Sequence, residues 1–495
     1  MAGNKQKTFT RRKASQTVRV AITLPGADLP QGPVSFSGAI TGDNLKKMQP
    51  DKSHIEKTKA HLAKMGFEIT GTGQFSINAR CSRKTYEEIF GTELKRHKLP
   101  FAEGQRCQAN AFYFPGEDAS WSPEAELSSL IDDAYIQWPH IYLDSRFPGT
   151  TSALPPSVNY HHLRVPGDVT MLLNADLAHR QGITGKGVRV AMIDSGFAQG
   201  HAYFQERGYQ TQTVLAPGAT DDDLDGNGHG TAESANLLAM APDVEFTGVK
   251  LDNESFPANG ATILEGLQTA MEHNPQVISV SLGYDLCDRN NGGKHYTSLP
   301  NSLKALEMEI KAIEDSGTIV VFSAGNGHVA FPGMMPEVVS AGGAYVAEDG
   351  AMRASDYASA FASQIYPNRS VPDVSGLVGL ADNGARYIML PLQPKCEIDR
   401  QNPDGTAKDD GWATISGTSA AAPQLAGAIA LLLQKNPGLT TDDIKAAFAQ
   451  TSRDVVDGNA NPASNETNGG VPASQEPDGA TGSGLVDLAA ALDQV

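Results

Sequence analysis

The 495-residue chain is too long for one average domain and long enough for two. Its 40% hydrophobic and 19% charged residues are typical of an ordinary globular protein. The formal net charge of −18 gives no electrostatic support to nucleic-acid binding. No apolar run approaches the ~18 residues that a membrane span needs. We therefore expect neither a nucleic-acid nor a membrane partner.

Residues 1–16 form a basic tail without the apolar stretch and small-residue cleavage site of a secretory signal. The chain has four cysteines: Cys81, Cys107, Cys287 and Cys396. They lie far apart with no CxxC pair, which argues against a zinc site or a disulfide-dense scaffold. Reduced, buried thiols in a cytoplasmic protein are the preferred interpretation.

Residues 17–145 alternate between strand and helix patterns. Apolar residues alternate with more polar ones at 18–24 and 75–81, which predicts two half-buried strands. Ser53 and Thr85, each followed three residues later by glutamate, predict the N-caps of two helices. The order predicts a small α+β domain with a split-βαβ (ferredoxin-like) sheet and two helices on one face.

The segment from His61 to Leu94 resembles the propeptide domain of the sedolisin, or kumamolisin, peptidases. In that family such a domain assists folding and blocks the active site. The resemblance implies that residues 17–145 are a propeptide-like domain, and a generic α+β module is the alternative. Residues 146–180 are rich in proline and glycine and are predicted to be a linker and the start of the mature region.

Residues 181–495 show the pattern of a doubly wound α/β domain with a mostly parallel sheet. Three apolar runs are continuous rather than alternating: Val188–Ile193, Val277–Leu282 and Thr318–Ala324. Such runs are typical of parallel strands that are covered on both faces. Helical stretches at 261–272 and 301–315 lie between them. In this fold class, functional side chains gather at the carboxyl ends of the strands.

Three polar residues stand at positions where such a site is expected. Asp194 directly follows the first apolar run, and His229 lies in the sequence GNGHGT before a helix-compatible stretch. Ser419 lies in SGTSA, before a small-residue helix at 420–433. A serine hydroxyl needs a base to become a nucleophile, and the base needs a carboxylate to orient it. Taken singly, each residue also has an ordinary structural interpretation as a turn, surface or cap residue.

The order Asp, His, Ser with the motifs AMIDSG, GHGT and GTSAAAP resembles the subtilisin-like serine peptidases, over about residues 180–495. The resemblance implies that Ser419 is the nucleophile, His229 the general base and Asp194 the residue that orients it. Asn326, in the sequence SAGN after a strand, matches the family's side-chain donor to the oxyanion. The backbone N–H of Ser419 is the second donor. These residues predict a serine endopeptidase that requires no cofactor for catalysis.

The resemblance also implies a set of substrate-binding residues. An edge segment would pair with the substrate backbone by β-augmentation, and one wall and the floor of a pocket would hold the side chain before the scissile bond. These residues are Ser281, Leu282 and Gly283 for the edge, Ser323, Ala324 and Gly325 for the wall, and Ala330 for the floor. The small, neutral Ala330 predicts a preference for an apolar substrate side chain.

Three features depart from the subtilisin pattern or remain without a role. Glu233 stands where sedolisins carry a second catalytic carboxylate, although a solvated helix acid is the preferred interpretation. The acidic run at 221–225 leaves structural calcium open without assignable ligands, and a solvated loop is preferred. Residues 383–410 look like an insertion, for which the sequence predicts no function.

The preferred hypothesis is a zymogen that acts on protein or peptide substrates. Residues from about 20 to 145 would occupy the cleft as an intramolecular partner until the chain is cut within about 140–175. A catalytically silent binding module on the same fold is one alternative. A peptide transacylase that uses the same triad is another, because an amine could take the acyl group in place of water.

Overall fold

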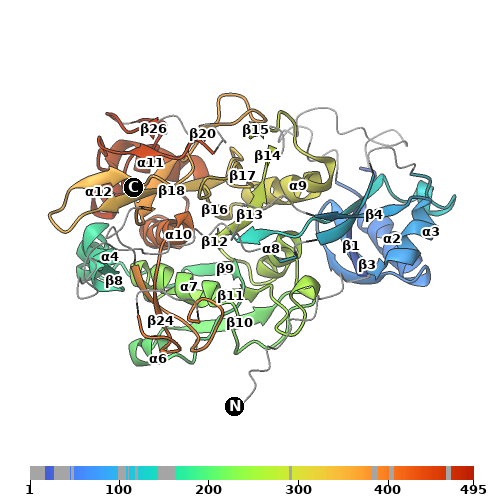
Figure 1. The fold of residues 1–495 in the computed structure, drawn as a ribbon, viewed down its shortest axis with the longest axis horizontal. Helices are drawn as coiled ribbons and strands as arrows, with labels where there is room; N and C mark the ends of the chain where they lie inside the picture. The colour runs from blue at the N-terminus through green and yellow to red at the C-terminus, as the bar shows by residue number, and fades with distance from the viewer. Residues whose placement is uncertain are drawn as a thin grey trace, which may run out of the picture.

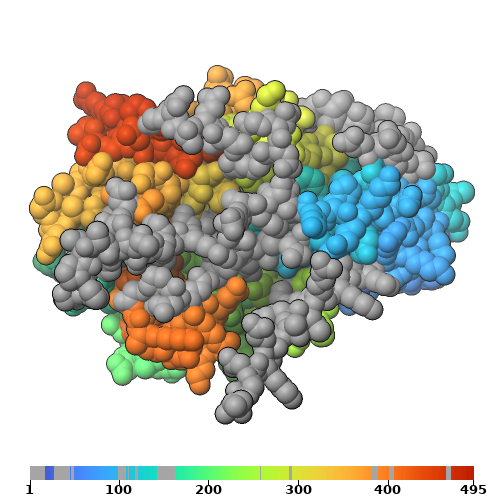
Figure 2. Space-filling model, viewed as in Figure 1, coloured from blue at the N-terminus to red at the C-terminus, as the bar shows by residue number. Residues whose placement is uncertain are grey.

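The computed structural model describes twelve stretches of the chain: residues 17–26, 45, 49–98, 108–109, 111–116, 121–142, 162–288, 293–381, 388–400, 406–463, 470–475 and 477–495. The predicted basic tail, Cys107, residues 143–145 of the predicted N-terminal domain and residues 146–161 of the predicted linker lie outside these stretches. A smaller N-terminal unit lies at one end of a larger α/β unit (Figure 1). In the space-filling view this smaller unit forms the blue lobe (Figure 2).

The N-terminal unit is built on a four-stranded antiparallel sheet with the order β2-β3-β1-β6. Its strands are β1 (Thr17–Thr23), β2 (Glu68–Thr72), β3 (Ser76–Ser82) and β6 (Asp133–Ile136), and its helices are α2 (Lys52–Lys64) and α3 (Arg83–Phe90). Ile22 and Ile77 of the sheet and Phe90 of α3 are fully buried in its core. The strand order, with β3 between β1 and β2, is the predicted split-βαβ arrangement.

Both predicted helix caps in this unit are wrong. Helix α2 has Asp51 as its N-cap, and no side chain caps it. Helix α3 is capped by Ser82, whose hydroxyl accepts a hydrogen bond from the Thr85 N–H at 3.0 Å. Thr85 is therefore the third residue of its helix rather than its cap. The capping hydroxyl comes instead from Ser82, the last residue of β3.

The larger unit contains an eight-stranded sheet with the order β10-β11-β9-β12-β16-β18-β19, in which β22 also pairs with β18. Its strands are β9 (Arg189–Asp194), β10 (Thr211–Leu215), β11 (Glu245–Lys250), β12 (Val277–Val280), β16 (Ile319–Ser323), β18 (Val339–Val346), β19 (Met352–Ala354) and β22 (Val374–Leu377). All pairings are parallel except that of β18 with β19. The sheet confirms the predicted, mostly parallel α/β fold.

Helices cover both faces of this sheet (Figure 1). α7 (His229–Met240) and α10 (Thr418–Lys435) pack on one face, and α8 (Ile263–Met271) and α9 (Asn301–Asp315) pack on the other. Neighbouring side chains of β16 point alternately into the two apolar cores on either side of the sheet. Val321 packs in the core under α7 and α10, and Phe322 packs in the core under α8 and α9. This double burial explains why the strands are continuously apolar.

Shorter elements complete the described part of the chain. The helical ones are η1 (Leu127–Ser129), α4 (Gly167–Leu172), α5 (Ala175–Arg180), α6 (Ala202–Arg207), η2 (Pro257–Asn259), α11 (Thr441–Thr451) and α12 (Leu488–Gln494). The strands are β4 (Leu94–Lys98), β5 (Ala111–Pro115), β7 (Ile141–Tyr142), β8 (Leu163–Arg164), β13 (Leu282–Asp285), β14 (Cys287–Asp288), β15 (Lys294–His295), β17 (Ala330–Phe331), β20 (Phe361–Ala362), β21 (Ser370–Val371), β23 (Ile388–Pro391), β24 (Trp412–Ile415), β25 (Asn459–Ala460) and β26 (Val471–Pro472). Within the described stretches, no helix is long and apolar enough to cross a membrane.

The open face of the N-terminal sheet packs against α8 and α9 of the larger unit. Thr70 Oγ1 donates to Glu265 Oε1 at 2.6 Å, and Asn78 Nδ2 donates to Gln268 Oε1 at 2.9 Å. Ala21 of β1 is fully buried in the core that also contains the apolar side chains of α8 and α9. The contact therefore combines a continuous apolar core with paired polar groups.

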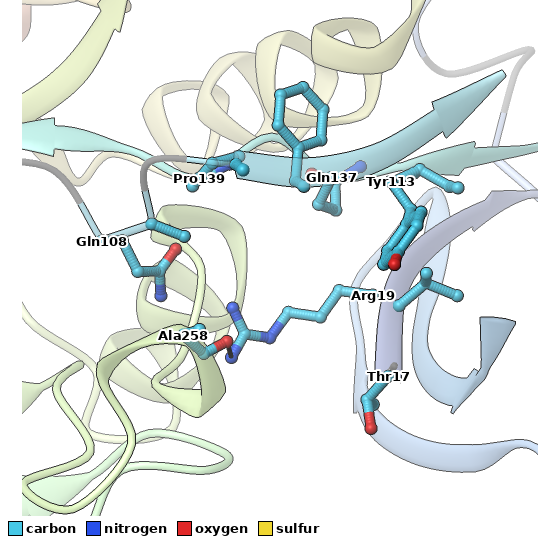
Figure 3. A pocket seen from close by; sticks show the side chains of 12 residues that line it. Thr17, Arg19, Gln108, Tyr113, Gln137, Pro139 and Ala258 are labelled. Carbon is cyan, nitrogen blue, oxygen red and sulfur yellow. Dashed lines mark hydrogen bonds between the residues drawn. The ribbon is translucent and has the colours of Figure 1, made fainter. Parts of the chain in front are cut away.

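A crevice lies at the edge of this contact (Figure 3). Arg19 extends from β1 across the crevice, and its Nη2 donates to the Ala258 carbonyl at 3.2 Å. Gln108 lies beside it and donates to the Ala261 carbonyl at 2.8 Å. Burial lowers the pKa of Arg19 to about 10, opposed by the nearby Glu265 carboxylate. The N-terminal unit is thus tied to the loop before α8 by side chains that donate to main-chain carbonyls.

Candidate active site

Asp194 and His229 meet at the carboxyl end of the sheet. Asp194 is the last residue of β9, and His229 is the first residue of α7. The Nδ1 of His229 lies 2.7 Å from Oδ1 of Asp194, and both side chains are buried. A Cβ on Gly230 would lie 2.9 Å from the Cβ of Asp194, so glycine lets the start of α7 approach the strand this closely. The carboxylate therefore fixes the orientation of the imidazole.

The loop before His229 is organised by Asp225, a residue that the sequence interpretation had grouped with the exposed acids. Its side chain is fully buried, and its Oδ1 accepts hydrogen bonds from Ser195 Oγ at 2.9 Å and the Gly228 N–H at 2.8 Å. Its Oδ2 accepts from the N–H and the hydroxyl of Thr231 at 2.9 and 2.6 Å. Burial raises the pKa of Asp225, although these hydrogen bonds oppose the rise. Asp225 thus holds both sides of His229.

Ser419 is the second residue of α10, which packs beside α7 on the same face of the sheet. Pro423 lies inside this helix and has no N–H to donate to the Ser419 carbonyl. Ser281 Oγ donates to that carbonyl instead, at 3.0 Å. The helical hydrogen bond that Pro423 removes is therefore replaced by a contact with Ser281, the residue before β13.

The carboxamide of Asn326 is oriented by the turn before Ser419. Its Oδ1 accepts hydrogen bonds from the N–H and the hydroxyl of Thr418 at 2.9 and 3.2 Å. Its Nδ2 is buried and donates to none of the residues that the structure describes. A Cβ on Gly417, whose φ is +139°, would lie 3.0 Å from this Nδ2. The turn therefore keeps an amide donor aimed beside Ser419.

The predicted edge segment is the middle strand of a small sheet with the order β17-β13-β7. Leu282 pairs with Tyr142 and Gly283 with Ile141 in antiparallel register, so β7 from the end of the N-terminal unit lies along this segment. Ser281 precedes the pair and contacts Ser419 as described above. The segment can therefore bind an extended chain that runs toward Ser419.

The predicted wall and floor residues also come together. Ser323 ends β16, Ala324 follows it, and the Gly325 N–H donates to the Thr418 hydroxyl at 3.1 Å. A Cβ on Gly325, whose φ is +101°, would lie 3.0 Å from the Cβ of Ala330. Ala330 is buried in β17, which pairs with the far end of β13. The wall, the floor and the edge segment thus adjoin one another next to the turn of Ser419.

Glu233 is fully buried, so its interpretation as a solvated helix acid is wrong. Its Oε2 accepts a hydrogen bond from Asn236 Nδ2 at 2.9 Å. Asn236 in turn accepts from Gln424 Nε2 of α10 at 3.2 Å. This chain of polar groups joins α7 to α10, the two helices that carry His229 and Ser419.

Part of the predicted insertion packs on the loop before His229. The N–H groups of Glu397 and Ile398 donate to the carbonyls of Gly226 and Asn227 at 2.8 and 3.1 Å. A Cβ on Gly228, whose φ is +97°, would lie 2.4 Å from Sγ of Cys396. The segment 388–400 therefore braces this loop, and no sequence signal indicated the contact. Residues 383–387 and 401–405 of the predicted insertion lie outside the described residues.

The acidic run at 221–225 does not form a recognisable metal centre. Asp221, Asp222 and Asp223 are exposed, in agreement with the preferred solvated loop, whereas Asp225 is buried. No group of three or more histidine, cysteine, aspartate or glutamate side chains in the described part of the chain could hold a metal ion. The side chains of Cys81, Cys287 and Cys396 are buried.

Comparison with known proteins identifies the family. The model of the subtilase family (Peptidase_S8) matches residues 185–480. Alkaline elastase YaB from Bacillus sp. (strain YaB) is 27% identical over 385 residues, which cover 73% of this chain and 87% of that protein. Subtilisin E from Bacillus subtilis (strain 168) is 26% identical over 296 residues, which cover 57% of this chain and 64% of its own length. The match therefore spans less than two thirds of subtilisin E.

Among solved structures, fervidolysin from Fervidobacterium pennivorans, a keratinolytic enzyme related to subtilisin, has a similar fold. The TM-score is 0.56 at 16% sequence identity, and the match covers 98% of this chain and 62% of that one. At this identity the likeness is one of fold alone. Together with the family match, it confirms the resemblance to subtilisin-like peptidases that the sequence motifs predicted.

Proposed function

This chain belongs to the subtilase family and is a subtilisin-type serine endopeptidase, and we propose that Ser419 is its nucleophile, with His229 as base and Asp194 as the group that orients the base. The observation that carries this proposal is the 2.7 Å contact between Asp194 Oδ1 and His229 Nδ1. It leaves Nε2 as the ring nitrogen that can take the proton of a serine hydroxyl.

The proposed reaction proceeds in two steps. The Oγ of Ser419 attacks the scissile carbonyl carbon while His229 takes its proton, and the oxyanion accepts hydrogen bonds from Asn326 Nδ2 and the Ser419 N–H. His229 then gives the proton to the leaving amine, and an acyl-enzyme ester remains on Ser419. Water then attacks the ester carbonyl in the same way, the bond to Ser419 Oγ breaks, and the acid product is released. The mechanism uses no cofactor, and structural calcium remains an open proposal without assigned ligands.

We further propose that residues 17–145 act as a propeptide whose end occupies the substrate strand. The pairing of β7 with β13 supports this proposal, because an extended substrate would use the same edge. In an extension of this register, the residue after Tyr142 would lie opposite Ser281. Because Ser281 contacts Ser419, that residue would lie beside Ser419. The first cleavage is therefore proposed at the Leu143–Asp144 bond, within the broader window 140–175 that the sequence predicted.

The proposed substrates are proteins or peptides with an apolar side chain before the scissile bond. The closeness of Ala330 to Gly325 supports a neutral pocket. A relative is named an elastase, which fits such a preference. Leucine at position 143 satisfies it as well. A cytoplasmic location, the absence of membrane and nucleic-acid partners, and the domain boundaries at 145 and 180 remain predictions.

The test compares intact masses of the wild type, Ser419→Ala and the matched exposed-site control Ser255→Ala over time. We expect the wild type and the control to lose 143 residues, or about 15 kDa at the mean residue mass of the chain, and Ser419→Ala to stay whole. Cleavage of Ser419→Ala at the same rate as the wild type would refute the assignment of Ser419 as the nucleophile. A new amino terminus other than Asp144 would refute the proposed bond.

Two further readouts separate the alternative functions. A serine-directed phosphonate should label Ser419 in the cleaved wild type, and no labelling would favour the silent binding module. Product masses with a peptide and an added amine separate hydrolysis from transacylation. An amide product in place of the free acid would establish the transacylase.

A further inference from the structure

Lys250 is a fully buried lysine at the end of β11. Its backbone lies opposite Asp194 in the parallel pairing of β11 with β9. Its Nζ donates to the main-chain carbonyls of Asp221 and Leu224 at 2.7 and 2.6 Å and to Glu254 Oε1 at 2.5 Å. Three oxygens therefore meet the three N–H groups of the ammonium.

This arrangement has the chemistry of a bound-cation site. Main-chain carbonyls and a carboxylate are the ligands that hard cations such as calcium prefer. A buried ammonium is tolerated only when it is fully paired, because its desolvation is expensive. We propose that Lys250 acts as an internal cation in place of a metal and holds the 221–226 loop, and thereby positions His229.

The connection from Lys250 to His229 runs through two carboxylates. Glu254 Oε1, which the ammonium neutralises, also accepts the Gly226 N–H at 3.2 Å. The neighbouring Asp225 accepts hydrogen bonds from Gly228 and Thr231, on the two sides of His229. Without the ammonium, Glu254 would be a partly buried anion beside two unpaired carbonyls, and the loop would lose its anchor. Lys250 touches no reacting atom and is a positioning residue.

The effect of Lys250 on stability is tested in the Ser419→Ala protein, so that the result does not depend on the proposed activity. Lys250→Ala and Lys250→Met should each lower the Tm by roughly 5–10 °C, because each removes a buried ammonium group and leaves its several hydrogen-bond partners unpaired. Millimolar calcium or ethylammonium should restore about half of the loss in Lys250→Ala, whose cavity admits a cation. Neither cation should restore Lys250→Met, in which the side chain fills the same space.

The matched control is Lys311→Met, another buried lysine paired with two carboxylates, Glu307 and Glu337, at 3.3 Å each. It should lower the Tm without gaining any response to cations. An unchanged Tm in both Lys250 variants, or equal cation responses in Lys250→Ala and Lys311→Met, would overturn the proposal. Glu254→Gln is the milder variant if the lysine variants do not fold, and its Tm should fall without recovery by calcium.

The positioning part rests on the proposed function and is read from kinetics in the active background. Lys250→Ala should lower kcat about tenfold with little change in KM, and ethylammonium should restore kcat. A rise in KM alone, or a loss of activity that only follows the unfolded fraction, would overturn the positioning role. If the wild type is inactive, the proposed function fails, and the Tm responses still decide whether Lys250 serves as a cation.

Discussion

Glu309 provides a pH-dependent prediction at the contact between the two units. This glutamate of α9 is buried, and the turn between β2 and β3 lies directly on its carboxyl group, since a Cβ on Gly73 would lie 2.2 Å from Oε2. Phe75 and Met308 form part of a small apolar cluster beside it. Burial raises the pKa of Glu309 to about 7, although hydrogen bonds with Gln74 and Gln268 oppose the rise.

The direction of the effect follows from linkage. Below pH 4.5 the carboxyl group is protonated in both the folded and the unfolded chain, so it costs no stability. Between pH 4.5 and about 7 only the unfolded chain ionises, and the stability therefore falls as the pH rises. Above about pH 7 the full cost applies, and a pKa raised from 4.5 to about 7 corresponds to about 3 kcal/mol.

Glu309→Gln in the Ser419→Ala background should remove this dependence. The free energy of unfolding of the variant should exceed that of its parent by up to about 3 kcal/mol at pH 8, and the difference should vanish near pH 4. Urea unfolding at four or five pH values measures it. Parallel stability curves for the two proteins across pH 4–8 would refute the reasoning, as would a difference that grows toward acid pH.

Three further substitutions test the candidate site. Asn326→Ala should lower kcat about 10²–10³-fold with little change in KM. A rise in KM with an unchanged kcat would contradict its role as an oxyanion donor. Asp225→Asn should lower both the Tm and kcat, because an amide cannot accept all four hydrogen bonds that the carboxylate accepts; wild-type kcat would exclude a role in holding His229. Gly228→Ala should lower kcat and the Tm, because a Cβ would clash with Cys396 at φ +97°, and Cys396→Ala should partly rescue it. Failure of that rescue would show that backbone strain, rather than the clash, is responsible.

Local sequence patterns predicted the fold and the contact of Asp194 with His229. Continuous apolar runs identified the parallel strands, and α9 has the predicted bounds of 301–315. Asp194 was expected at a strand end because polar side chains there line the edge of a parallel sheet, and the structure brings it to His229. These features depend on signals within a few residues of each other.

Features that depend on packing between distant segments were missed. Glu233 is polar and lies on a helix, so the local pattern favoured solvent. Its side chain is nevertheless fully buried, and its partner Asn236 accepts a hydrogen bond from Gln424 of α10. The contacts of Glu397 with Gly226 join segments about 170 residues apart, and no periodicity records such a pairing. Lys250 was unremarked because a lysine that ends a strand is ordinarily exposed.

The proposed role of residues 17–145 as a propeptide, combined with the pairing of β7 with β13, has a consequence for the order of events in activation. Under this proposal, the segment that fills the substrate strand is tethered while the chain is whole, and its effective concentration is set by the linker at roughly millimolar levels. Dilution cannot displace a tethered segment. After the cut, the same contacts become a bimolecular complex, whose occupancy falls with total protein concentration. Activity should therefore appear later in concentrated than in dilute samples, even when both are cleaved at the same rate.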